Sequence, residues 1–188
     1  MIDEQTIEDG LVLRQFTLDD AEAFYAVVDA NREAIASYML WARTLASVDE
    51  VREMIAGWLE ARDRSLGVTL GVYEAGRLVG SVYHVRGCRK HLNVEIGYWL
   101  ATEARGRGVA TRVVRAMFDL TFDELGFHRA YLRIAPQNEA SMAIAERLGL
   151  EKEGVLRDLW QMAPGEFWDG VIYATTAPRW ATQKAGAA

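Results

Sequence analysis

Hydrophobic and polar residues follow two different patterns along this chain, one typical of strands and one typical of helices. Leu11–Gln15 alternates and predicts a short strand. Helical spacing follows, with Thr17 and Asp20 placed to cap one helix and Ser47 and Glu50 placed to cap another. We therefore predict that the first third of the chain is helical after one strand.

From residue 67 onward the pattern favours strands. Residues 67–87 alternate around a central Glu-Ala-Gly, which indicates a β-hairpin, and Leu92–Ala101 is the next strand candidate. A helix with an apolar stripe from Val109 to Leu120 follows, and Gly126 is placed to end it. The remaining elements are predicted as a strand at 128–135, a helix at 138–149, and strands at 153–162 and 167–176. Mixed α/β elements without a repeat or linker predict one domain over 1–188, with a core at about 11–180 and a frayed tail at about 182–188.

Composition limits the class of protein. The chain has 188 residues, of which 51% are hydrophobic and 26% charged, so one sizeable core can form. Its single cysteine, Cys88, excludes an internal disulfide and a multi-cysteine zinc site, and its three histidines lack metal-ligand spacing. We predict no metal. The acidic start and the lack of a long apolar run predict a cytoplasmic protein that does not insert into membranes.

Charge is distributed unevenly around a net value of −6. Residues 1–63 hold 14 acids and 5 arginines, a net charge of −9, whereas residues 64–188 hold 13 acids and 16 bases, a net charge of +3. The overall sign argues against a nucleic-acid binder. An acidic first third suits a cationic substrate and a basic remainder an anionic cofactor, although solvated helix faces would give the same count.

One basic, glycine-containing turn precedes the helix that starts at Val109. The sequence Arg-Gly-Arg-Gly occupies residues 105–108. A helix start presents N–H groups without partners and a partial positive charge, and glycine lets a phosphate approach the backbone. The turn is neither a Walker loop nor a dinucleotide motif, because no Gly-Lys-Ser/Thr follows and Thr111 stands at the third glycine position. It predicts a pyrophosphate site; the alternative is an arginine-decorated helix start.

The order of these motifs resembles the GNAT superfamily of N-acetyltransferases, and more narrowly its RimJ/RimL group, which acetylates protein N-termini, including those of ribosomal proteins. The likeness covers about residues 11–180. The motifs that carry it are Asn31–Glu33, Leu40–Trp41, Glu95–Leu100, Arg105–Ala110, Asn138 with Ser141, Glu146–Leu150, Glu153–Arg157 and Asp169–Tyr173.

This resemblance implies a fold, a cosubstrate and its binding residues. The fold would be a mixed, mostly antiparallel twisted sheet of about seven strands with flanking helices. Acetyl-CoA would enter where two parallel strands, Leu92–Leu100 and Ala130–Ala135, splay apart, and its acetyl group would pass directly to an amine. The pantetheine arm would pair with the backbone of Tyr98, Trp99 and Leu100, and the pyrophosphate would be held by amides of Arg105, Gly106, Arg107, Gly108, Val109 and Ala110.

Transfer needs a group that accepts a proton from the amine and one that returns a proton to sulfur. Glu95 is the predicted base, directly or through water; alternatively it is a solvated residue or the partner of an arginine. Many GNAT enzymes place a tyrosine near sulfur, but Ala145 stands at that position here, so the resemblance suggests Ser141 instead. Serine is also ordinary in the first turn of a helix.

Other residues complete the expected site. Asn138 is predicted to cap its helix and contact pantetheine. Asn31, Arg32 and Trp41 fall where GNAT proteins build the acceptor pocket; the alternatives are a helix cap for Asn31 and a core position for Trp41. Aromatic residues at 99, 168 and 173 are predicted to lie in the core or an interface, and the last strands could support a homodimer.

The predicted function is acetylation of a primary amine, most simply the N-terminal amine of a protein such as a ribosomal protein. A free α-amine has a pKa of about 8 and lysine one of about 10.4, so an N-terminal acceptor demands less of a base. The open alternatives are a detoxifying acetyltransferase for small or aminoacyl-like amines, a non-catalytic acyl-CoA-binding module, and a nucleotide-binding protein of another fold.

Overall fold

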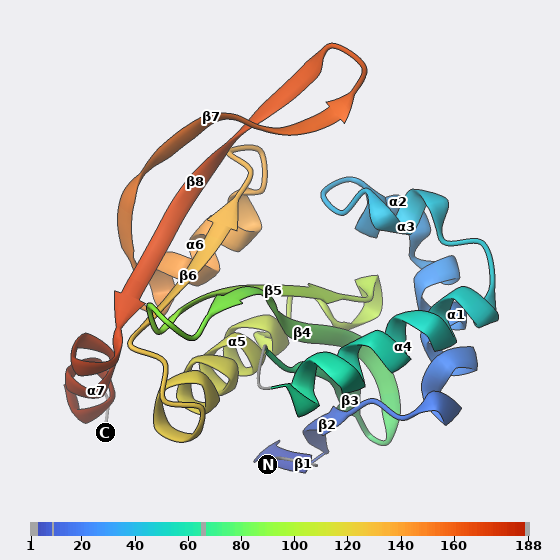
Figure 1. Ribbon diagram of the computed structural model, residues 1–188, viewed down its shortest axis with the longest axis horizontal. Helices are drawn as coiled ribbons and strands as arrows, with labels where there is room; N and C mark the ends of the chain where they lie inside the picture. The colour runs from blue at the N-terminus through green and yellow to red at the C-terminus, as the bar shows by residue number, and fades with distance from the viewer. Residues whose placement is uncertain (1–3, 9, 65–66, 187–188) are drawn as a thin grey trace. The chain divides into compact units, whose positions relative to one another are not determined.

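The computed structural model describes residues 4–8, 10–64 and 67–186, and Figure 1 shows their ribbon. The chain divides into two compact units, Met1–His84 with Tyr98–Ala116, and Val85–Gly97 with Met117–Ala188. Strands β4 (Arg77–Cys88) and β5 (Asn93–Leu100) and helix α5 (Val109–Asp119) each begin in one unit and end in the other. Within the described ranges, no helix is long and apolar enough to cross a membrane.

The first unit combines an antiparallel sheet with a set of short helices. Each strand pairs with the next along the chain, from β1 to β4. The Ala75–Gly76 turn that joins β3 to β4 has positive φ at both residues, which matches the predicted hairpin. The other elements of this unit are β1 (Glu4–Glu8), β2 (Leu11–Gln15), η1 (Leu18–Asp20), α1 (Ala21–Ala30), α2 (Arg32–Ala36), α3 (Trp41–Thr44), α4 (Val48–Asp63), β3 (Thr69–Glu74) and η2 (Thr102–Ala104).

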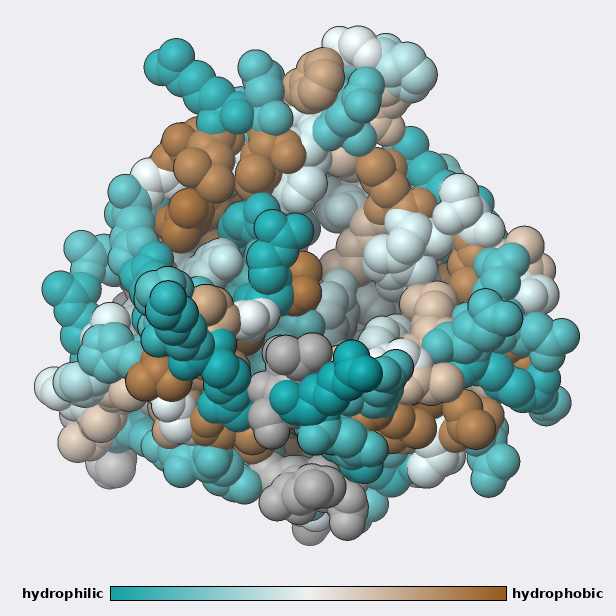
Figure 2. Space-filling view, viewed as in Figure 1, coloured by the Kyte–Doolittle hydropathy of each residue, from teal (hydrophilic) through white to brown (hydrophobic). Residues whose placement is uncertain are grey.

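The second unit contains the parallel pair of the sheet. β5 pairs with β6 (Arg129–Ile134) in parallel, β6 pairs with β8 (Glu166–Thr176) and β8 with β7 (Glu151–Ala163), both antiparallel. A π-helical turn η3 (Leu120–Glu124), helix α6 (Glu139–Arg147) and helix α7 (Ala177–Gly186) complete this unit. Figure 2 shows hydrophobic residues exposed over β7 and β8, where Val155, Leu156 and Phe167 are the exposed large hydrophobic side chains.

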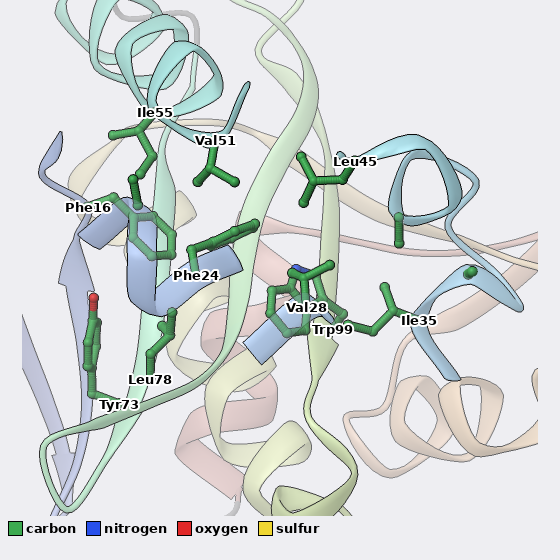
Figure 3. Packing of buried hydrophobic residues seen from close by; sticks show 13 residues of the cluster. Phe16, Phe24, Val28, Ile35, Leu45, Val51, Ile55, Tyr73, Leu78 and Trp99 are labelled. Carbon is green, nitrogen blue, oxygen red and sulfur yellow. The ribbon is translucent and has the colours of Figure 1, made fainter. Parts of the chain in front are cut away.

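The core of the first unit lies between its helices and its sheet (Figure 3). Phe24 of α1 packs edge-on against Trp99 of β5 and against Phe16. The centroid of its ring lies 5.6 Å from that of Trp99 and 5.5 Å from that of Phe16. Val51 and Ile55 of α4 are fully buried in the same cluster. The predicted helical spacing of the first third therefore produces one apolar face, which covers the strands.

The predicted mixed, mostly antiparallel sheet is confirmed. In the described part of the chain, eight strands hydrogen-bond in the order β1-β2-β3-β4-β5-β6-β8-β7, against about seven expected. The additional strand β1 has the sequence Glu-Gln-Thr-Ile-Glu, whose single aliphatic residue gives no hydrophobic alternation. At the other end, α7 continues to Gly186, into the segment that we expected to be frayed. A single domain over 1–188 remains a prediction.

Candidate active site

The end of β5 in the first unit carries the predicted pantetheine-binding backbone. Trp99 and Leu100 are each 5% exposed, and Tyr98 is half-buried. The N–H of Ala101 donates to the carbonyl of Val79 on β4 at 2.8 Å. A Cβ on Gly80 would stand 2.3 Å from the Trp99 carbonyl oxygen, so β4 and β5 approach more closely here than any side chain allows. The position of this strand end is therefore fixed by backbone packing.

The predicted pyrophosphate turn connects η2 to α5. Gly106 and Gly108 have φ of +74° and +75°, the left-handed region that favours glycine. A Cβ at Gly106 would meet no atom within 4 Å, so the space beside this residue is open. The turn leads directly into α5, an eleven-residue helix whose first N–H groups have no acceptor within the helix. Val109 is buried and Ala110 half-buried. The geometry fits an anion held by backbone amides.

The two arginines of this turn bind protein groups. Arg105 Nε donates to the Leu100 carbonyl oxygen at 2.9 Å. Both terminal nitrogens of Arg107 donate to the Glu74 carboxylate, at 2.9 and 2.7 Å, and this pairing lowers the pKa of Glu74 below its ordinary value. We expected both guanidinium groups to add charge for a phosphate. In the structure both guanidinium groups are engaged by protein groups around the turn. That they also contribute charge to a bound phosphate stays a prediction.

The three predicted acceptor residues also lie in the first unit, and each is engaged by the protein. Asn31 is 8% exposed, and its Oδ1 accepts the Thr102 N–H at 2.8 Å. Arg32 Nη1 donates to the carbonyls of Ala42 and Leu45 at 2.6 and 2.8 Å. Trp41 is half-buried, with its ring centroid 6.3 Å from that of Trp99. Asn31 occupies the N-cap position of α2, but its side chain does not cap that helix, and Trp41 is a partly buried residue packed against the core. A role for the three residues in acceptor binding stays a prediction.

Glu95, the predicted base, lies in the second unit. It pairs in register with Tyr131 of β6, and its side chain is 7% exposed. Arg133 Nη2 lies 2.7 Å from Glu95 Oε2, but Oε2 has no hydrogen-bond partner among the described residues, so the contact is an ion pair that is poorly aligned for a hydrogen bond. Pairing with a neighbouring arginine was the alternative reading of this residue. The pairing does not exclude catalysis, because the carboxylate keeps unused acceptor positions.

The start of α6 holds the other two predicted residues of this unit. Asn138 caps the helix as expected, with its Oδ1 accepting the Ser141 N–H at 3.2 Å. Ser141 is 9% exposed, and Ala145 is fully buried. Asn138 and Ser141 are therefore brought together by one helix cap.

Two residues near Glu95 were not predicted. Tyr131 and Arg133 share the face of β6 opposite to buried Ala130, Leu132 and Ile134. Burial, and then the negative charge of Glu95, raise the pKa of Tyr131 above its ordinary value, so its phenol stays a hydrogen-bond donor. The alternation of residues 129–134 indicates that Tyr131 and Arg133 share one face of their strand. It does not indicate that this face lies beside Glu95, because that requires the partner strand and the register.

The register of β5 and β6 is also relevant to the predicted splay. Asn93, Val94 and Glu95 pair with Arg129, Ala130 and Tyr131. In the described part of the two strands, pairing ends there, although β5 continues to Leu100 and β6 to Ile134. A splay between the two strands after this point, where acetyl-CoA would enter, stays a prediction. Over the ranges that the structure describes, no cluster of His, Cys, Asp or Glu could hold a metal.

Comparison with known proteins gives relatives along nearly the whole chain. A family model for the acetyltransferase (GNAT) domain matches residues 10–151. "Putative ribosomal N-acetyltransferase YdaF" of Bacillus subtilis (strain 168) is 28% identical, over 95% of this chain and 97% of its own. "Uncharacterized N-acetyltransferase YoaA" of the same organism is 30% identical, over 91% and 96%.

Solved structures share the fold. The Microcin C7 self immunity acetyltransferase MccE, in complex with acetyl-CoA and AMP, superimposes with a TM-score of 0.84 at 22% identity, covering 90% of this chain and 94% of its own. The ribosomal L7/L12 alpha-N-protein acetyltransferase RimL, in complex with coenzyme A, gives 0.85 at 20% identity, covering 91% and 96%.

A mixed sheet with one parallel pair, together with a glycine turn that opens a helix, is consistent with an acyl-CoA-dependent transferase, and the relatives show that class. The chain belongs to the GNAT acetyltransferase family. It is an acetyltransferase that uses acetyl-CoA, as members of this family do, and it is similar to the RimJ/RimL group.

Proposed function

We propose that this enzyme transfers the acetyl group of acetyl-CoA to the N-terminal α-amine of a protein, such as a ribosomal protein, in the cytoplasm. The observation that carries this proposal is end-to-end similarity to a relative named as a ribosomal N-acetyltransferase, over 95% of this chain and 97% of the relative. The fold likeness to RimL supports the same acceptor class. An α-amine also suits the site chemically, because its pKa of about 8 leaves part of it neutral at neutral pH.

In the proposed reaction the amine nitrogen attacks the thioester carbonyl directly. The new C–N bond forms, the C–S bond breaks, and the sulfur leaves as thiolate. Glu95, directly or through a water molecule, accepts the proton that the amine releases. Ser141, near the start of α6, passes a proton to this thiolate and takes one back from water, and the proton on Glu95 returns to solvent, so that the acetylated amine and the free thiol are the products. The Tyr131 phenol is a further donor near Glu95. The turn at residues 105–110 binds the pyrophosphate through its amides, while Tyr98–Leu100 and Asn138 bind pantetheine.

A small-molecule or aminoacyl-conjugate amine is the second candidate acceptor. The fold likeness to a self-immunity acetyltransferase solved with acetyl-CoA and AMP favours it. Residues 1–63, with a net charge of −9, would attract either kind of cationic acceptor.

One assay separates the acceptor classes. Purified enzyme with labelled acetyl-CoA is offered N-terminal peptides, the same peptides with a blocked α-amine and a free lysine, and small amines. We expect transfer to free α-amines and at least tenfold lower kcat/KM with blocked peptides. Preference for small amines would support detoxification instead. Tight acetyl-CoA binding without transfer to any amine would indicate a non-catalytic acyl-CoA-binding module.

We also propose a homodimer formed through β7 and β8. β7 is at the edge of the strand order, and Val155, Leu156 and Phe167 expose apolar area there. Analytical ultracentrifugation of the protein and of its Leu156→Lys variant tests this assembly; a monomer in both would contradict it.

A further inference from the structure

The turn before the predicted pyrophosphate site is capped by a side chain from a distant part of the first unit. Asn31 Oδ1 accepts the N–H of Thr102, the first residue of η2, at 2.8 Å across 71 residues of sequence. Thr102 directly follows the N-cap residue Ala101, so its N–H has no acceptor within the turn. Asn31 therefore supplies the cap that the local sequence lacks.

Hydrogen bonds to both neighbouring helices hold Asn31 in position to accept the Thr102 N–H. It stands between α1 and α2, where its Nδ2 donates to the Val27 carbonyl at 3.0 Å and its own carbonyl accepts the Ile35 N–H at 3.0 Å. The residue is 8% exposed. Both ends of its amide are thus used within the protein, and few side-chain atoms are accessible to an acceptor molecule.

The direction of the following amides depends on η2. The Ala104 and Arg105 N–H groups donate to the carbonyls of Ala101 and Thr102, at 3.0 and 3.2 Å, and the chain then passes through the two glycines of positive φ into α5. Glycine allows many backbone directions, so neighbouring contacts must select one. A partly buried N–H without a partner is unfavourable, and the turn would rotate to satisfy it.

We propose that Asn31 is a positioning residue for the acetyl-CoA turn, acting through the Thr102 N–H, and not a residue that binds the acceptor amine. This inference rests on the proposed binding of the pyrophosphate by the amides of 105–110. Through Asn31, helices α1 and α2 would contribute to cosubstrate binding, whether or not they also contribute to acceptor binding.

Two substitutions at Asn31 separate this role from others. Asn31→Asp keeps an oxygen for Thr102 but loses the donor to Val27, whereas Asn31→Leu loses both. We expect Asn31→Leu to raise the Kd for acetyl-CoA about tenfold in calorimetry, equivalent to about 1.4 kcal/mol, and Asn31→Asp to stay within about threefold. In the ligand-free protein, amide hydrogen exchange over 102–108 should accelerate in Asn31→Leu alone.

A rescue and a control sharpen the test. Thr102→Pro removes the N–H itself, and Ala101 already has φ −56° and ψ 150°, the conformation favoured before proline. Adding Thr102→Pro to Asn31→Ala should therefore recover most of the lost acetyl-CoA affinity. Val51→Ala, in the buried core of the same unit, should lower stability and leave the Kd unchanged.

The outcomes distinguish this proposal from the proposed function. Unchanged hydrogen exchange at 102–108 in Asn31→Leu, or an equal loss of affinity in Val51→Ala, overturns the role of Asn31. If the unsubstituted protein does not bind acetyl-CoA, the proposed function fails, and the exchange measurement still decides whether Asn31 holds the turn.

Discussion

Glu95, the proposed base, also forms a largely buried ion pair. Its carboxylate and the Arg133 guanidinium are 2.7 Å apart, with side chains 7% and 18% exposed. Arg133 also lies 5.7 Å from the ring centroid of Trp160. Because both charges have lost most of their water, removing one leaves the other unsatisfied. A loss of activity at Glu95 therefore needs a control for folding.

We predict that Glu95→Gln lowers kcat by about 100-fold or more and destabilises the fold by about 3 kcal/mol, since Arg133 loses its counter-ion. Glu95→Gln/Arg133→Met removes both charges and should recover stability to within about 1 kcal/mol, while kcat stays low. Urea unfolding and single-turnover rates measure the two effects. Recovery of kcat in the double variant would show that Glu95 is only structural.

Asp20 gives a second residue-scale prediction, this one on pH. Burial opposes ionisation of Asp20, but hydrogen bonds from Arg14 and from the Thr17 N–H outweigh it and lower the pKa below the ordinary value. A carboxylate with a lowered folded pKa stabilises the protein above its unfolded pKa of about 3.9, and this stability is lost as the pH falls through the folded pKa.

Asp20→Asn should accordingly cost about 1–2 kcal/mol at pH 7 and less at pH 3, which lies below the unfolded pKa of about 3.9, so that part of the contribution of the folded carboxylate is already lost. Urea unfolding at both pH values measures the difference. Asp19→Asn, at the exposed neighbouring carboxylate, is the control and should change little at either pH. An equal cost of Asp20→Asn at pH 3 and pH 7 would contradict the charge-based explanation.

In the first unit, β4 and the end of β5 pack closely at Gly80. Gly80 has space for hydrogen only, because a Cβ would lie 2.3 Å from the Trp99 carbonyl and 2.6 Å from Leu100 Cδ2. These are residues of the predicted pantetheine strand. Any larger residue at 80 must therefore move the strand that we propose binds the cosubstrate.

We predict that Gly80→Ala lowers the free energy of unfolding by about 1–3 kcal/mol and weakens acetyl-CoA binding. Gly57→Ala is the matched control, since a Cβ at Gly57 of α4 meets no atom within 4 Å and alanine favours helices by about 0.5–1 kcal/mol. Chemical unfolding and calorimetry should show opposite changes in stability for the two variants. Normal acetyl-CoA affinity in Gly80→Ala would argue against binding by this strand.

Element boundaries from β2 to β8 could largely be predicted from sequence, because hydrophobic spacing and caps act locally. Ser47 caps α4 by accepting the Glu50 N–H, and Gly126 and Gly149 adopt the expected positive φ after their helices. The partners of Glu95, Asn31 and Arg107 could not be predicted in the same way. Their contacts join strands or helices far apart in sequence, and no local pattern encodes which carbonyl, amide or carboxylate a side chain will reach.

For the molecule as a whole, binding of the cosubstrate should appear as stabilisation. Ligands that bind only the folded state stabilise it by mass action, by about 2.7 kcal/mol at 100 times Kd. For a chain of this size that is a rise in Tm of about 5–10 °C. The rise should be specific to acetyl-CoA and coenzyme A.

The measurement is a thermal-unfolding series with acetyl-CoA, coenzyme A and ATP at equal concentrations. ATP carries phosphates but no pantetheine, so we expect it to raise Tm by less than half as much. An equal rise with ATP would show that the protein recognises only a nucleotide phosphate. Such a result would conflict with a pantetheine-binding strand at Tyr98–Leu100.

The bond between Asn31 and Thr102 also bears on biosynthesis. A ribosome adds about 5–20 residues per second, so the 71 residues between the two partners take about 4–14 s to emerge. During that interval Asn31 Oδ1 lacks its partner, the Thr102 N–H, because Thr102 has not yet been made. If α1 and α2 fold slowly or wrongly, the Thr102 N–H has no Asn31 oxygen to bond when the turn at 102–108 is made, so an error in the first helices would reach the proposed acetyl-CoA turn.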